Sequence, residues 1–156
     1  KEALFSQSIL ASFRNKWYVK LSTGRLYIRH LTGIVADCLS LKMLDEQSRP
    51  SPASLLVNEI NNDRPEINRL YEEAYERVKR LINKRIKEMS RMHIVPFTTD
   101  TDLIEDKARA ILSTLVGAIA LARNLSSEQE QACLLRSAQK QIIAMLGLQE
   151  SEFELV

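Results

Sequence analysis

Apolar residues recur every three or four positions along most of this chain, which is the spacing of one face of an α-helix. No stretch alternates with the period of two that half-buried strands show. The apolar stretches are separated by short segments rich in Pro, Asn, Asp, Ser and Gly, which end helices. The pattern predicts an all-α fold, a bundle of about six helices in one domain that covers residues 1–156. The expected helices cover residues 1–18, 25–44, 53–61, 65–92, 102–124 and 126–147.

Sequence signals mark the starts of the last two expected helices. Asp102 is followed three residues later by Glu105, which resembles a capping box at the start of a helix. The last helix has two candidate starts, Ser126 with Gln129 or Ser127 with Glu130. Either start leaves only a short break after residue 124, the expected end of the preceding helix.

The expected helix 102–124 is apolar around almost its whole circumference after residue 108, so both of its sides need a partner. One side carries large apolar residues for the core, and the other carries small residues that let another helix approach. The last helix has an unusually wide apolar stripe, and together the two predict a four-helix interface in a symmetric dimer. The alternative is that both stripes close a monomeric bundle. The expected dimer residues are Ala110, Ser113, Gly117, Ala120, Leu121, Leu134, Leu135, Ala138, Ile142 and Met145.

Three stretches resemble regulators of the TetR (tetracycline-repressor-like) family. Residues 1–5 (KEALF) resemble the start of their fourth helix, residues 111–123 (ILSTLVGAIALAR) their penultimate helix, and residues 125–146 their cap and last amphipathic helix. The resemblance implies a dimerisation and effector-binding domain of a transcriptional repressor. Residues 1–18 would then link it to a helix-turn-helix, which these residues do not contain, so operator DNA is expected to be contacted only by a missing N-terminal domain.

The same resemblance implies a small apolar or amphipathic effector, held between the helices 25–44, 65–92 and 102–124. The simpler interpretation of each aromatic and methionine is that it belongs to the core. The expected pocket residues are Tyr27, His30, Ile34, Tyr71, Tyr75, Val78, Met89, Met92 and Phe97.

The alternative function is a helical protein–protein interaction module without DNA binding, and an all-helical enzyme ranks last.

Charge argues against a chain that binds nucleic acid with its whole surface. There are 22 Lys and Arg residues against 20 Asp and Glu, a net charge of +2. Basic residues gather in the second half of helix 65–92, where they could attract phosphate. The pairs Glu73 with Arg77 and Glu76 with Arg80 favour a solvated, internally paired helix face instead.

Catalytic and metal-binding patterns are missing from the sequence. His30 and His93 are the only histidines, without nearby Cys or carboxylates at ligand spacing, so no metal, cofactor or catalytic residue is expected. Cys38 and Cys133 are far apart and form no CxxC pair, which is typical of a reducing compartment. No apolar run is long enough for a membrane span, so we expect a cytoplasmic protein without a membrane partner.

Overall fold

The computed structural model describes Val35, Leu39, Leu44 and residues 65–96 and 100–148. This part contains three helices, α5 (Pro65–Arg91), α6 (Thr101–Arg123) and α7 (Glu128–Met145). It contains no strand, so the described part of the chain is all-α, as the sequence pattern predicts. The other expected helices, residues 1–18, 25–44 and 53–61, lie outside the described residues apart from Val35, Leu39 and Leu44.

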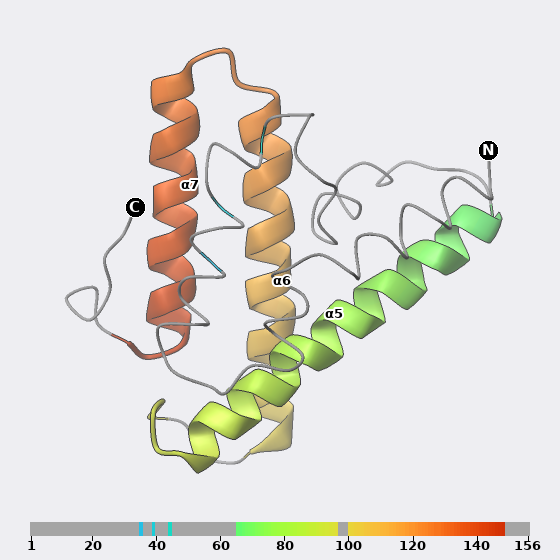
Figure 1. Cartoon of the computed structure of the whole chain (residues 1–156), viewed down its shortest axis with the longest axis vertical. Coiled ribbons are helices and arrows are strands. Elements are labelled where there is room, and N and C mark those ends of the chain that lie inside the picture. Colours follow the sequence, from blue (N-terminus) through green and yellow to red (C-terminus); the bar gives the residue numbers. More distant parts are fainter. Residues whose placement is uncertain (1–34, 36–38, 40–43, 45–64, 97–99, 149–156) are drawn as a thin grey trace.

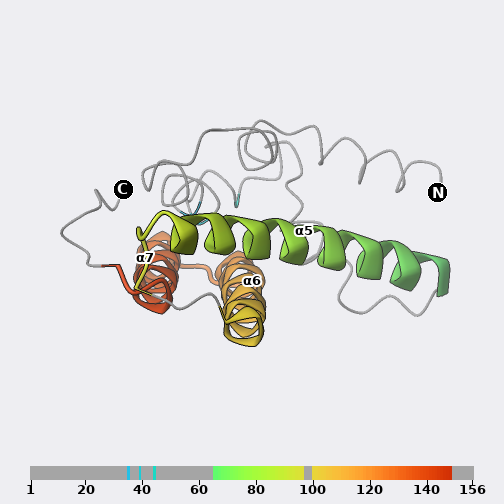
Figure 2. The same cartoon turned by 90° about the horizontal axis from the view of Figure 1, so that it is seen from below.

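Helices α6 and α7 lie side by side and run in opposite directions, while α5 crosses the pair on one face (Figure 1). Figure 2 shows that no other described element covers the face of α6 and α7 opposite to α5. The turn at residues 124–127 is short, which holds the two helices together as neighbours. A hydrogen bond also joins the start of α6 to the end of α7, because Lys107 Nζ donates to the Met145 carbonyl at 2.6 Å.

The two helix starts obey local capping chemistry. The Asp100 carboxylate accepts from the Asp102 N–H at 3.0 Å, so α6 begins one residue earlier than expected and the predicted Asp102–Glu105 capping box is wrong. Asp100 takes the cap because its extended backbone directs its carboxylate at the first turn. Ser127 Oγ accepts from the Glu130 N–H at 3.3 Å, which confirms the second of the two predicted starts of α7.

The ends of α5 and α7 share one hydrogen-bonding pattern, in which a residue with positive φ follows the last turn. At α7 this residue is Gly147 (φ 69°), and the Leu148 N–H donates to the Ile143 carbonyl at 3.2 Å. At α5 it is His93 (φ 54°), and the Ile94 N–H donates to the Met89 carbonyl at 3.0 Å. His93 is therefore an exposed residue that caps the end of α5.

The core lies where α5 crosses the α6–α7 pair. Because apolar residues at helical spacing line the inner face of each helix, one continuous cluster forms. Gln139 of α7 is buried in it, and its Nε2 donates to the Leu39 carbonyl at 3.3 Å while its Oε1 has no partner in the described part of the chain. The largest fully buried side chains of the core are Leu39, Ile86, Met89, Ile104, Leu112, Ile119, Ile142 and Leu146.

Candidate dimerisation interface

The side of α6 that carries small residues lies on the face that no described element covers (Figure 2). Its residues recur at spacings of three and four along the helix, and all are exposed or half-exposed. The large side of the same helix faces inward, where Ile111, Leu115 and Ile119 are buried. The large side therefore belongs to the chain's own core, as expected, and the small side is exposed or half-exposed. We call the outer side the open α6 face; it consists of Ala110, Ser113, Gly117, Ala120 and Leu121.

The centre of the open α6 face is flat. A Cβ atom added at Gly117 would meet no heavy atom within 4 Å, so open space lies above the backbone there. Small residues let a second helix approach closely, because the distance between helix axes depends on the side chains at the crossing. Leu121, which is 61% exposed, is a large apolar residue on this face and is well placed to fill a hollow on a partner.

The hydroxyl groups near this face are already hydrogen-bonded to their own helices. Ser113 Oγ donates to the Ala110 carbonyl at 2.9 Å, and Thr114 Oγ1 donates to the same carbonyl at 2.8 Å. On α7, Ser137 Oγ donates to the Cys133 carbonyl at 2.9 Å. A partnered hydroxyl loses little when water is removed, so the cost of burying this face is low.

Three of the α7 residues expected at the interface are not on the surface. Leu135, Ala138 and Ile142 are buried in the core of the same chain, so they offer no surface to a second copy. Their side of α7 is turned inward because it packs against α6 and Leu39. Leu134 and Met145 are half-buried against that core. The exposed side of α7 instead carries the small or polar residues Cys133, Ser137, Gln141 and Ala144, which the sequence reasoning missed because it searched for apolar residues.

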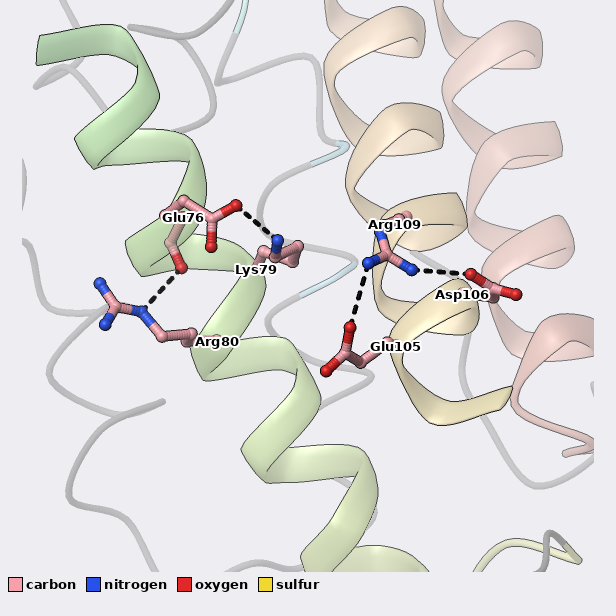
Figure 3. Close-up of polar contacts among 6 residues, drawn as sticks. All are labelled: Glu76, Lys79, Arg80, Glu105, Asp106 and Arg109. Atoms are coloured by element: carbon pink, nitrogen blue, oxygen red, sulfur yellow. Dashed lines mark hydrogen bonds and ion pairs between the residues drawn. The ribbon is translucent and has the colours of Figure 1, made fainter. Parts of the chain in front are cut away.

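Charges near the start of α6 are paired within the helix (Figure 3). Arg109 donates to Asp106 at 2.7 Å and to Glu105 at 3.0 Å. The hydrogen bond with Asp106 raises the pKa of Arg109 above its ordinary value, and the nearby negative charges add to the effect. This cluster has one positive and two negative side chains, a net charge of −1 beside the open α6 face.

The predicted pocket residues are spread over several environments. Val78 and Met89 are buried in the core, whereas Tyr71 and Tyr75 are half-buried against it. The Tyr75 ring has Lys79 Nζ 5.3 Å from its centroid. Met92 lies beyond the end of α5 and is 48% exposed. The other expected pocket residues, Tyr27, His30, Ile34 and Phe97, lie outside the described residues.

Metal and membrane chemistry have no support in the described part of the chain. Among its residues there is no group of three or more His, Cys, Asp or Glu side chains placed to hold a metal ion. None of its helices has the length and apolar character needed to cross a bilayer.

Compared with known proteins, the chain matches no family model, no curated protein and no solved structure.

Proposed function

We propose that this chain is the dimerisation and effector-binding domain of a TetR-like transcriptional repressor, and that it pairs with a second copy through the open α6 face and the exposed side of α7. The observation that carries the proposal is the open α6 face itself, which is small and flat at Gly117 and has partnered hydroxyls. A two-fold axis through such a face brings two antiparallel helix pairs together as a four-helix interface.

The regulatory part of the proposal concerns how such a dimer would transmit effector binding. In a two-fold dimer, a change in the crossing of the α6–α7 pairs moves every element attached to them, including any DNA-reading head joined before residue 1. An effector that prefers one crossing shifts the population toward it. Helix α5 carries Tyr71 and Tyr75 beside the core, where an amphipathic ligand would find an apolar ring and a polar hydroxyl together.

The pairing is tested with the variant Ser113→Arg, because Ser113 is exposed at the middle of the open α6 face. A long charged side chain there would be buried without a partner, so the dimer should dissociate into single chains in size-exclusion chromatography with light scattering. Asn68→Arg is the control, since Asn68 is exposed on α5 near its start. A dimer that survives Ser113→Arg would count against this interface, and a chain that is monomeric before mutation would favour the interaction-module alternative.

Effector binding is tested by thermal unfolding of the full chain with a panel of amphipathic aromatic compounds. A compound present at about 100 times its Kd stabilises the folded state by about 2.7 kcal/mol, which is easily detected. Tyr71→Ala should reduce the shift for an active compound, whereas Asn68→Ala at an exposed position of the same helix should not. If active compounds shift Tyr71→Ala as much as the unmodified chain, the tyrosine does not line the site.

A further inference from the structure

The second half of α5 carries a straight line of positive charge. The intervals between its basic residues are three, four, three and four, so all five share one face of the helix over about 21 Å. Four of the five side chains are exposed, and Lys87 is half-buried. We call this surface the α5 basic stripe; it consists of Arg77, Arg80, Lys84, Lys87 and Arg91.

The core fixes the direction in which the α5 basic stripe faces. Val78, Ile82 and Ile86 occupy the opposite side of the helix and are buried, so α5 cannot turn the stripe inward without exposing them. Figure 3 shows Lys79 extending from α5 toward α6, whereas Arg80 extends away from α6. The stripe is therefore presented outward as part of the fold.

The helix dipole does not explain this arrangement. The negative end of a helix dipole favours cations only within about the last turn, which covers Arg91 but not Arg80 or Lys84. Basic residues of α5 outside the stripe form ion pairs within the helix: Arg69 with Glu73, Lys79 with Glu76 and Arg85 with Glu88. Arg80 Nε donates to the Glu76 backbone carbonyl at 3.2 Å rather than to its carboxylate.

Charge is also separated along the whole chain. Residues 77–91 contain seven basic residues and one acidic residue, a net charge of +6. Because the chain as a whole has a net charge of +2, all the other residues together have a net charge of −4. A small total charge therefore conceals one strongly positive surface, and a local surface of this kind attracts polyanions.

We propose that the α5 basic stripe binds the phosphate backbone of duplex nucleic acid without reading its sequence. The proposal goes beyond the dimerising role and does not depend on it. Arg and Lys side chains in a line of about 21 Å suit a linear polyanion, and contacts of this kind position a duplex without reading its bases.

Other occupants fit this surface less well. A membrane would need an apolar face beside the charges, but the apolar side of α5 is in the core. A protein partner would need large apolar anchors, and among the described residues the nearest exposed one, Met92, lies beyond the end of the stripe. A single strand would need aromatic platforms, whereas Tyr71 and Tyr75 are packed against the core.

The test compares two double variants that remove equal charge from the full chain. Arg80→Gln with Lys84→Gln changes the stripe, and Arg69→Gln with Arg109→Gln changes two exposed residues of α5 and α6 outside it. The readout is the fluorescence anisotropy of a labelled duplex of about 20 base pairs at several salt concentrations between about 50 and 200 mM. The unmodified chain should bind weakly, with a Kd in the range of about 1–100 μM.

The stripe variant should bind about tenfold more weakly, and its dependence of log K on log salt should be shallower by about 1.8, because two phosphate contacts are lost. The variant at Arg69 and Arg109 should stay close to the unmodified chain. Equal losses in both variants, or no binding at the lowest salt, would overturn the proposal. So would tighter binding to phosphatidylserine-rich vesicles or to a poly-glutamate peptide, since either result would assign the stripe to another partner.

Discussion

Replacing Leu121 with alanine removes a large apolar side chain from the open α6 face while leaving the core intact. Leu121 is 61% exposed, so most of its surface is free to be covered by a second copy. Leucine has three more carbon groups than alanine, and each contributes about 0.8 kcal/mol when fully buried, or about 2.4 kcal/mol in all. Scaled to the exposed share, the loss is about 1.5 kcal/mol for each copy.

Both copies lose this contribution in a two-fold dimer, so the total loss is about 3 kcal/mol, or about a hundredfold in the dissociation constant. Folding of the single chain should change by less than about 1 kcal/mol, because the side chain is mostly exposed and alanine favours helices. Sedimentation equilibrium measures the dissociation constant, and chemical denaturation measures the free energy of unfolding. The two measurements separate a weakened interface from a damaged fold.

Met92→Ala provides the matched control. Met92 is 48% exposed, a comparable fraction, but it lies beyond the end of α5 and away from the open α6 face. Its replacement should leave the dissociation constant within about twofold, since no contact at the interface is removed. If Leu121→Ala dissociates no more readily than Met92→Ala, the open α6 face does not carry the pairing and the reasoning is refuted.

Three stability predictions follow from the helix ends and the core, each measured by the free energy of unfolding. His93→Gly should stabilise the fold by about 0.5–1 kcal/mol, because glycine avoids a positive-φ penalty of about 1–2 kcal/mol. Part of this gain is lost because glycine has more conformational freedom in the unfolded chain. Ser127→Ala should destabilise it by about 1 kcal/mol, because the Glu130 N–H loses its acceptor. Gln139→Met should cost less than Gln139→Ala, because both remove the donor to the Leu39 carbonyl and the unpartnered Oε1, but only alanine also leaves a cavity.

Each of these predictions has its own control. Gly147→Ala should destabilise the chain, because Gly147 also has a positive φ and alanine is strained there whereas glycine is not. Ser126→Ala should be neutral if Ser127 alone caps α7. Stabilisation by Ser127→Ala, no gain from His93→Gly, or equal costs at Gln139 would each contradict the capping or packing argument concerned.

Local chemistry made several features predictable from the sequence. The Ser127 cap needs only residues within one turn of it, and the three described helices begin and end within a few residues of the expected positions. The two sides of α6 were also assigned correctly, because small and large residues separate cleanly on its circumference. Asp100 was missed because another acidic residue, Asp102, lies two positions later and also fits the capping pattern.

The surface residues of α7 could not be predicted from the sequence, because they depend on long-range packing. Periodicity identifies Leu135 and Ile142 as apolar positions of α7, but it does not say whether their partner is the same chain or a second copy. In the structure they are used in the chain's own core, and small or polar residues such as Ser137 are left outside. The sequence also did not show which basic residues of α5 share an outward face, because this depends on how the helix is buried.

The pairing of two copies through the open α6 face is the central claim, and the mass of the chain in solution tests it most directly. Sedimentation equilibrium at micromolar concentration should give twice the chain mass of 17.8 kDa for the unmodified protein and a shift toward a single chain for Ser113→Arg. A mass of one chain for the unmodified protein, or a dimer that Ser113→Arg leaves intact, would contradict the claim.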